Sequence, residues 1–302
     1  MSGEEMEIAI TLVQNGDMIL PDDILLGETK HCLGDRAMRV GKLGPGALDI
    51  VILDHSGQQD SLQSILLERL PHHVDVCVQP VVGREKKLLL CDMDSTIIGQ
   101  ECIDELAEYA GLKDRISAIT ERAMRGELDF EAALTERVSL LKGLALTSLQ
   151  ACFDDRIRLT PGARTLVQTM KARGARAELV SGGFTFFTSR VAEKTGFDAD
   201  FANVLLDDGT ALTGEVQHPI LGKQAKLDRL QAALGELGLD LNHAVAIGDG
   251  ANDSAIIEAA GLGLGFNPHP VLADAANAVI SGPSLTTALY FQGIPKSDWI
   301  EA

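Results

Sequence analysis

The hydrophobic pattern of the chain is dominated by short apolar runs that end abruptly in polar residues. Residues 88–90 are all leucine, and an acidic segment follows almost at once. An apolar run of this kind is typical of a buried parallel strand. Further strands are predicted at 175–180 and 244–247, and each leads into a glycine-containing polar turn. Helical periodicity lies between these runs, so we expect an α/β fold with a Rossmann-like parallel sheet.

A different pattern fills the segment from about residue 101 to about residue 160. Apolar residues recur there at helical spacing in four short stretches, three of which end at or near a glycine. The apolar positions are Cys102, Leu106 and Ala110; Ile116, Ile119 and Ala123; Phe130, Leu134, Val138 and Leu141; and Leu149 and Phe153. Four short helices with short joints predict a compact helical-bundle cap inserted after the first acidic motif.

Residues 1–82 are expected to form a separate small α/β domain. Strands are predicted at 7–12, 47–53 and 74–78, and a helix at 61–70. The stretch from 20 to 46, rich in Gly, Pro and charge, shows no clear period. The charged run at 84–87 then predicts a linker into the second domain, residues 83–302.

Composition narrows the classes of partner. The 302 residues carry a formal net charge of −18, which disfavours nucleic acid and anionic membranes as partners. No apolar run is long enough to span a bilayer. Five cysteines form no Cys-x-x-Cys pair, and the acidic start of the chain differs from a basic signal peptide. We therefore expect a cytoplasmic protein with a small-molecule substrate, and the pattern leaves a homodimer open.

Asp92 and Asp94 follow the leucine run and are the first candidates for chemistry. In open α/β sheets, ligands bind at the carboxyl ends of the strands. Residues spaced i, i+2 in an extended chain point to the same side, so one carboxylate can attack while the other serves the leaving group. An ionised aspartate is already a nucleophile at neutral pH. Taken alone, the pair is also compatible with a turn or a simple metal site.

Two later strand ends carry further polar groups. Ser181-Gly182-Gly183 follows the strand at 175–180, and small residues before a helix form a cradle for anions. Asp249, Asn252 and Asp253 follow the strand at 244–247, and oxygen ligands favour a hard cation, magnesium first. Each segment alone is also ordinary turn chemistry, but their common order along the chain makes coincidence improbable.

Taken together, these segments resemble the haloacid dehalogenase superfamily of phosphohydrolases, and within it the phosphoserine phosphatase family. The resemblance covers roughly residue 84 to the last residue. Residues 1–82 stand where some relatives carry a small regulatory, ACT-like domain. The segments that carry the resemblance are Asp92-Met93-Asp94-Ser95-Thr96, Glu101, residues 126–142 with Phe130 and Arg137-Val138-Ser139-Leu140-Leu141-Lys142, Ser181-Gly182-Gly183-Phe184, and Gly248 to Asp253.

The resemblance implies hydrolysis of O-phospho-L-serine to L-serine and phosphate, the last step of L-serine biosynthesis. Asp92 would attack phosphorus and form an aspartyl-phosphate, and Asp94 would protonate the leaving serine and then activate water. Mg²⁺ would be held by Asp92, the backbone carbonyl of Asp94 and Asp249, with Asp253 supporting.

The resemblance also implies a set of phosphate ligands. Ser181, the N–H of Gly182 and Lys226 would hold phosphoryl oxygens, and Asn252 would lie beside them. A basic residue at the start of a helix is disfavoured by the helix macrodipole. The lysine at position 226 is therefore expected to have a role other than that of an ordinary exposed side chain. Lys223, three residues earlier, is the alternative for the same role.

Glu101 and Arg137 would take the ammonium and the carboxylate of the substrate, the arginine by a bidentate pair. From spacing alone, Arg137 reads as a solvated helix position. The nearest alternative function is another member of the superfamily, which acts on a different phosphomonoester or transfers the phosphoryl group to an acceptor other than water. An alternative from a different class of function is a ligand sensor or scaffold with an inactive phosphatase core. The intact acidic motif argues against this alternative.

Overall fold

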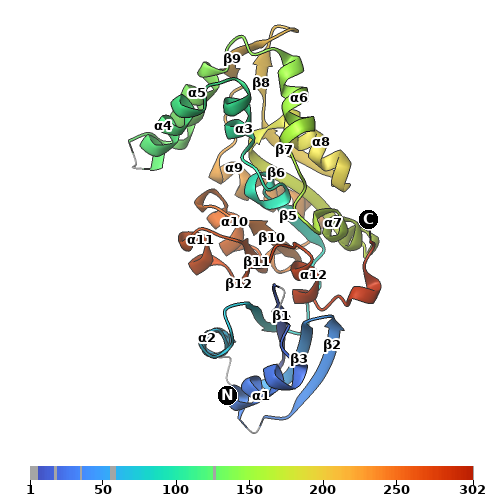
Figure 1. Cartoon of the computed structure of the whole chain (residues 1–302). Coiled ribbons are helices and arrows are strands. Elements are labelled where there is room, and N and C mark those ends of the chain that lie inside the picture. The colour runs from blue at the N-terminus through green and yellow to red at the C-terminus, as the bar shows by residue number, and fades with distance from the viewer. Residues whose placement is uncertain (1–5, 17–18, 35, 55–58, 125–126, 302) are drawn as a thin grey trace.

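The computed structural model describes residues 6–16, 19–34, 36–54, 59–124 and 127–301. A six-stranded parallel sheet forms the centre of the molecule, in the order β12-β11-β10-β5-β6-β7 (Figure 1). Its strands are β5 (Leu88–Cys91), β6 (Arg176–Phe184), β7 (Ala199–Asn203), β10 (Ala244–Gly248), β11 (Leu262–Phe266) and β12 (Ala278–Ile280). The predicted α/β class with a Rossmann-like parallel sheet is confirmed.

Both faces of this sheet are covered by helices, because alternate residues of its strands point to opposite sides. Leu88 and Leu90 of β5 pack with α9 and α10, whereas Leu89 and Cys91 belong to the core on the other face, which includes α7 and α8. The core helices are α7 (Ala163–Ala172), α8 (Thr185–Thr195), α9 (Lys223–Leu237), α10 (Ser254–Ala259), α11 (Pro270–Ala275) and α12 (Thr287–Phe291). The continuous burial of β5 explains why its sequence is uniformly apolar.

The chain reverses its direction of travel across the sheet at β5. From β5 it proceeds through β6 to β7 on one side, and later through β10, β11 and β12 on the other. The loops that follow β5, β6 and β10 therefore diverge from neighbouring strand ends. Such a switch point is where open α/β sheets bind their ligands.

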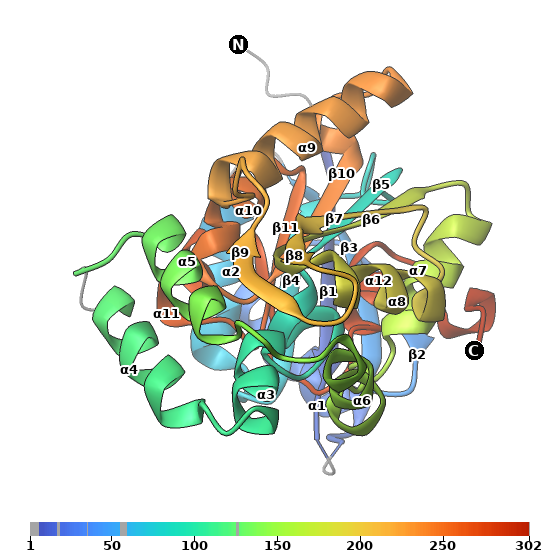
Figure 2. The ribbon, with the colours of Figure 1, turned by 90° about the horizontal axis from the view of Figure 1, so that it is seen from above.

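The predicted helical cap lies above these strand ends (Figures 1 and 2). Its helices are α3 (Cys102–Tyr109), α4 (Lys113–Met124), α5 (Phe130–Leu140) and α6 (Leu146–Arg156). The chain leaves and rejoins the core side by side, through an antiparallel bridge between Ile98 and Leu159. The cap also contacts a hairpin of the core, formed by β8 (Leu205–Asp207) and β9 (Leu212–Val216). After α5, the backbone N–H of Gly143 donates to Leu212 O of this hairpin at 2.8 Å.

The N-terminal domain is a four-stranded antiparallel sheet in the order β2-β3-β1-β4, with two helices (Figure 1). Ile8, Ile10 and Leu12 of β1 pack against those helices. The elements are β1 (Met6–Gln14), α1 (Asp22–Leu33), β2 (Met38–Gly44), β3 (Ala47–Asp54), α2 (Gln59–Arg69) and β4 (Val74–Pro80).

The opposite face of this sheet lies against the domain that holds the parallel sheet, through buried polar groups. Arg84 donates both terminal nitrogens to the two carboxylate oxygens of Asp49, each at 2.9 Å. Asp75, which is 4% exposed, accepts from the backbone N–H of Ser281 at 3.1 Å and from its hydroxyl at 2.5 Å. The two domains are therefore joined by a buried ion pair and buried hydrogen bonds, which would be lost if the domains separated.

Several elements were not predicted from the pattern. The segment without a period contains α1 and β2: α1 buries Thr29 in its apolar stripe, and β2 is a largely exposed edge strand. Both therefore lack the regular alternation that reveals an amphipathic element. The strands β7, β11 and β12 were also missed, because β7 is half-buried and β11 alternates leucine with glycine.

The structure also corrects the interpretation of the Ser-Gly-Gly segment as a turn that leads straight into a helix. Strand β6 continues to Phe184, and its pairing with β7 is interrupted between Val180 and Phe184. Helix α8 begins only at Thr185. The candidate anion cradle is thus a bulge in a strand. Among the described residues, no helix is long and apolar enough to cross a membrane.

Candidate active site

The ends of β5, β6 and β10 and the facing cap helices enclose a cavity of about 670 Å³. Its core wall is formed by the predicted residues Asp92, Asp94, Ser181, Gly182, Asp249 and Asn252. Its cap wall contains Glu101 at the start of α3 and Phe130 and Arg137 on α5. Lys226 and Asp253 lie behind the core wall, in contact with Asp92 or with each other. The structure therefore gathers all the predicted site residues around one cavity.

Asp92 is 3% exposed and stands at the first position after β5. Its Oδ1 accepts the N–H of Met93 at 2.7 Å, which fixes the carboxylate over the strand end. Its Oδ2 lies 2.8 Å from Lys226 Nζ and accepts from Asn252 Nδ2 at 3.1 Å. One oxygen of Asp92 is thus bonded to the backbone, and the other contacts the ammonium of Lys226 and the amide N–H of Asn252.

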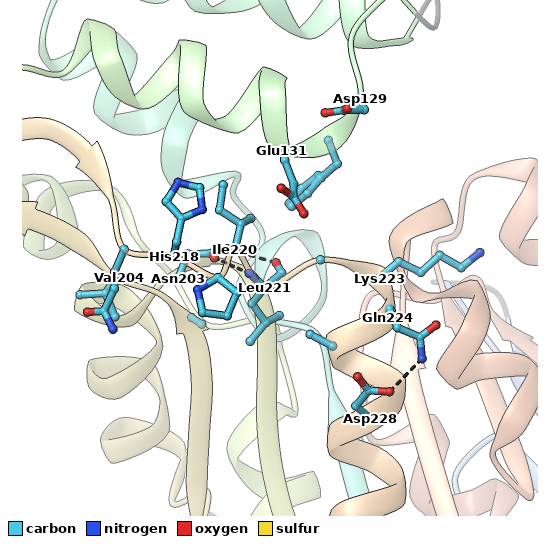
Figure 3. Close-up of a pocket in the computed structure, with 16 residues that line it drawn as sticks. Asp129, Glu131, Asn203, Val204, His218, Ile220, Leu221, Lys223, Gln224 and Asp228 are labelled. Carbon is cyan, nitrogen blue, oxygen red and sulfur yellow. Dashed lines mark hydrogen bonds between the residues drawn. The ribbon is translucent and has the colours of Figure 1, made fainter.

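Lys226 is 1% exposed although it carries a charge. Burial opposes the ammonium form, but the carboxylates of Asp92 and Asp253 outweigh it and raise the pKa of Lys226 above its ordinary value. Its Nζ lies 2.7 Å from Asp253 Oδ1. Lys223, the alternative in the sequence, is exposed and lines a separate hollow of about 780 Å³ (Figure 3). Of the two lysines, Lys226 is therefore the one that contacts Asp92.

Asp94 is oriented by two donors from different parts of the chain. Its Oδ1 accepts the backbone N–H of Cys102 at 3.0 Å, and its Oδ2 accepts the hydroxyl of Ser181 at 3.3 Å. Burial and the nearby charge of Asp92 raise the pKa of Asp94 to about 6. A side chain on Gly183 would come within 2.6 Å of this carboxylate, which gives the second glycine of the bulge its structural reason. A carboxyl with this pKa can both give and take a proton near neutral pH.

Carboxylate oxygens of Asp92, Asp249 and Asp253 lie within 4.8 Å of one another. Burial and the charge of Asp92 raise the pKa of Asp249 to about 6 and that of Asp253 to about 7. Among the described residues only Lys226 contacts the cluster as a cation, so negative charge is in excess. An all-oxygen donor set with unbalanced charge fits a hard divalent cation. Thr96 donates its hydroxyl to Asp249 Oδ1 at 3.3 Å and orients that ligand.

The cap contributes one group of each charge. Glu101 Oε1 accepts the hydroxyl of Ser95 at 2.6 Å, and burial together with the Asp94 charge raises the pKa of Glu101 to about 8. Arg137 is half-buried, and burial lowers its pKa against the opposing charges of Asp104 and Glu101. Its Nε donates to Ala133 O at 3.2 Å, while the side chain lines the cavity. The solvated position that spacing alone suggests for Arg137 is therefore wrong.

Some cavity residues were not foreseen. Asp104, Thr120, His269 and Val271 also line the cavity. They stand on helix or loop positions with ordinary spacing, and no local pattern separates them from surface residues. Asn203 lines the neighbouring hollow and is the last residue of β7, which the hydrophobic pattern did not reveal.

The comparisons with known proteins agree with this geometry. A family model described as haloacid dehalogenase-like hydrolase matches residues 89–258. The chain belongs to this family. A phosphoserine phosphatase from Archaeoglobus fulgidus is 44% identical over 214 residues, 70% of this chain and 62% of the relative. One from Polaromonas sp. is 42% identical over 221 residues, 72% of this chain and 94% of the relative. The chain thus spans less than two thirds of the archaeal relative but nearly all of the bacterial one.

Solved structures of the haloacid dehalogenase family extend the likeness. A family hydrolase from Salmonella enterica is 28% identical, with a TM-score of 0.85, and covers 94% of this chain and 98% of its own. That likeness therefore includes the N-terminal domain. A structure described as a phospho-aspartyl intermediate analogue of phosphoserine phosphatase is 39% identical, with a TM-score of 0.63, over 68% of this chain and 99% of its own.

Proposed function

We propose that this chain is a phosphoserine phosphatase, which hydrolyses O-phospho-L-serine to L-serine and phosphate as the last step of L-serine biosynthesis. One observation carries the proposal: a buried, lysine-paired aspartate faces a glutamate and an arginine of the cap across a single cavity. The first pair suits phosphoryl transfer, and the second suits an amino acid. Relatives named phosphoserine phosphatase at 44% and 42% identity support it.

In this mechanism Asp92 attacks phosphorus in line with the departing serine oxygen and becomes an aspartyl-phosphate. Asp94 gives its proton to that oxygen, because an alkoxide is a poor leaving group, and then takes a proton from the water that cleaves the acyl phosphate. The orientation of Asp94 by Cys102 N and Ser181 supports this double role. The likeness to a structure described as a phospho-aspartyl intermediate analogue supports the covalent step.

The phosphoryl oxygens are held by Ser181, the N–H of Gly182 and Lys226, and Asn252 lies beside them. Such chemistry depends mostly on positioning and on neutralising charge. We propose Mg²⁺ as the metal, held by Asp92, the carbonyl of Asp94 and Asp249. When bound, it neutralises negative charge on the phosphoryl group. Asp253 would support the metal site without being a direct ligand, since its two oxygens already accept hydrogen bonds from Lys226 and from Gly250 N.

The amino-acid part of the substrate is recognised by the cap. Glu101 pairs with the ammonium, and Arg137 forms a bidentate pair with the carboxylate. The cap would close over the bound substrate and keep bulk water from the acyl phosphate. These two charges at one end and the phosphate ligands at the other suit a zwitterion that carries a phosphate ester.

Residues 1–82 are proposed as a regulatory domain with an ACT-like arrangement, and the protein as a cytoplasmic one. The four-stranded antiparallel sheet with its two helices supports the first part. Its buried polar contacts with the core, Arg84 with Asp49 and Ser281 with Asp75, support communication between the two domains. The oligomeric state, monomer or homodimer, is read from sedimentation equilibrium of the whole chain.

The decisive experiment measures phosphate release from L-phosphoserine, with magnesium and with EDTA, beside a panel of other small phosphate esters. We expect strong, magnesium-dependent preference for L-phosphoserine. Activity on other esters but not on phosphoserine would keep the aspartyl-phosphate chemistry and discard the substrate. Inactivity on every ester would contradict the proposal that the chain is an enzyme and would favour the alternative of a sensor with an inactive phosphatase core.

A further inference from the structure

Asn203, the last residue of β7, is a buried amide that the mechanism above does not use. It is 2% exposed, and both ends of its side chain are engaged. Its Nδ2 donates to Gly182 O at 2.9 Å and to Leu221 O at 3.2 Å, and its Oδ1 accepts from Leu221 N at 2.6 Å. Figure 3 shows this side chain between the strand and the segment that leads to α9.

The first of these contacts lies where the sheet is interrupted. The pairing of β6 with β7 stops at Val180 and resumes at Phe184, whose partner is Asn203. In between, Ser181 and Gly182 leave the ladder and line the catalytic cavity. A bulge of this kind loses backbone hydrogen bonds that would otherwise hold its shape. The Asn203 amide replaces one of them at Gly182 O, next to the peptide group that the cradle presents.

The second contact fixes the start of α9. Asn203 bonds both the N–H and the carbonyl of Leu221, as a neighbouring strand would. Gly222 follows as the N-cap of α9, and Lys226 lies one turn later, its N–H bonded to Gly222 O at 3.3 Å. The position of Leu221 therefore sets where the helix begins and where the buried ammonium of Lys226 comes to lie.

We infer that Asn203 is a positioning residue, which holds the Ser181–Gly183 bulge and the first turn of α9 at a fixed separation around the phosphoryl group. No other side chain among the described residues is recorded with hydrogen bonds to both segments. Because phosphate ligands from two elements must meet the same group, a shift of about 1 Å between them would cost about a hundredfold in rate. The inference rests on the proposed function only for the identity of the group bound.

The test compares Asn203→Asp with a matched control, Gln292→Glu. Gln292 is also a 2% exposed amide with bonds to two backbone groups, Lys86 N and Ala288 O, but it lies outside the catalytic cavity. Both variants replace an N–H donor by an oxygen that faces a carbonyl, so both should lower the melting temperature. Only Asn203→Asp should also disturb the phosphate ligands. A second variant, Asn203→Ala, guards against misfolding, because Asn203 borders the open hollow and water can reach the vacated space.

Three quantities are measured in magnesium buffer: binding of inorganic phosphate by calorimetry, and kcat/KM for L-phosphoserine and for p-nitrophenyl phosphate. For Asn203→Asp we expect at least a tenfold loss of phosphate affinity and about a hundredfold loss of kcat/KM, equal for the two esters. Asn203→Ala should show smaller losses of the same kind, and Gln292→Glu should retain phosphate affinity.

Two results would overturn the inference. One is phosphate affinity and kcat/KM at the wild-type level in folded Asn203→Asp or Asn203→Ala. The other is an equal loss of phosphate affinity in Gln292→Glu, which would make the effect one of general stability. If the wild type binds phosphate but leaves phosphoserine intact, the proposed function fails, while the phosphate titration of the Asn203 variants still decides this inference.

Discussion

Lys226 Nζ lies 2.8 Å from Asp92 Oδ2 in a pair of which neither side chain is more than 5% exposed. Replacing this lysine by methionine keeps most of its length but leaves two carboxylates buried without their cation. Removing one partner of a buried ion pair costs about 3 kcal/mol or more. We expect Lys226→Met to lose that much unfolding free energy, together with nearly all phosphatase activity. Denaturant unfolding and phosphate release measure the two effects.

Lys223→Met is the control for this prediction, because Lys223 is exposed and starts the same helix. It should keep wild-type stability and activity. Loss of activity in Lys223→Met with retention in Lys226→Met would reverse the assignment of the phosphate-binding lysine.

Asp92→Asn replaces the nucleophile by a group of nearly the same shape. Because an amide cannot form the acyl phosphate, kcat should fall about 10⁴-fold or more. Phosphate release from L-phosphoserine checks this, and Asp49→Asn at the domain junction should keep its turnover. Normal activity in the Asp92→Asn variant would eliminate the covalent mechanism.

Arg137→Ala should separate the recognition of the amino acid from the chemistry on phosphorus. Without its guanidinium, the carboxylate of phosphoserine loses a bidentate partner, whereas an aryl phosphate has no such group. We expect kcat/KM for phosphoserine to fall at least a hundredfold more than that for p-nitrophenyl phosphate.

Arg122→Ala serves as the control for Arg137, since Arg122 is a cap arginine paired with Glu136 at 2.9 Å and outside the cavity lining. It should leave the ratio of the two substrates unchanged. An equal loss on both substrates for Arg137→Ala would show that the arginine acts only on the structure of the cap.

The pKa of Glu101 predicts a pH dependence of substrate choice. Burial and the Asp94 charge raise this pKa to about 8, so the carboxyl is mostly neutral at pH 7 and becomes ionised as the pH rises through 8. Only the ionised form pairs with an ammonium. The ratio of kcat/KM for phosphoserine to that for ethyl phosphate, an alkyl ester that needs the same proton from Asp94 but has no ammonium, should rise about 25-fold from pH 6.5 to 8.5.

Glu101→Gln should abolish this rise, because its amide does not titrate. Steady-state rates across the pH range measure the ratio for both proteins. A ratio that is flat in the wild type would mean that Glu101 does not bind the ammonium.

The buried pair of Arg84 with Asp49 is expected to contribute to the unfolding free energy through the domain junction. Its bidentate pair with Asp49 is largely buried, with side chains 16% and 10% exposed. Arg84→Ala should lower the unfolding free energy by about 3 kcal/mol. The exposed pair of Arg39 with Glu7 offers the control, since Arg39→Ala should cost about 1 kcal/mol or less. Equal effects in calorimetric unfolding would contradict a specific role for the junction.

The parts of the site that could be predicted from the sequence are those whose signal is local. Asp92 and Asp249 follow buried strands whose apolar residues are contiguous, so both strand and carboxylate are visible in one short window. Lys226 needed the resemblance to a known family, because a lysine in the first turn of a helix is common. Arg137 could not be placed from spacing, since its helix lies over a cavity that only the packing of the cap creates.

Elements whose stability comes from distant contacts escaped prediction. Strand β11 carries Gly263 because a side chain there would come within 2.1 Å of Ile257 O, so packing removed the apolar run that marks a strand. Asn203 is polar and buried, and the two segments to which it is hydrogen-bonded are 21 and 18 residues away along the chain. No window of neighbouring residues contains that information.

The bridge between Ile98 and Leu159 brings the two crossings of the cap to adjacent strand positions. At the strand ends, the inserted segment occupies no more space than a single tight turn, whatever its length. A module whose ends lie one strand spacing apart could therefore replace it without moving Asp92 or Asp249, provided that it supplies a backbone N–H to Asp94 as Cys102 does now. Exchange at this one place would give the same phosphorus chemistry a new substrate, and it marks where a library of chimaeric enzymes should be cut.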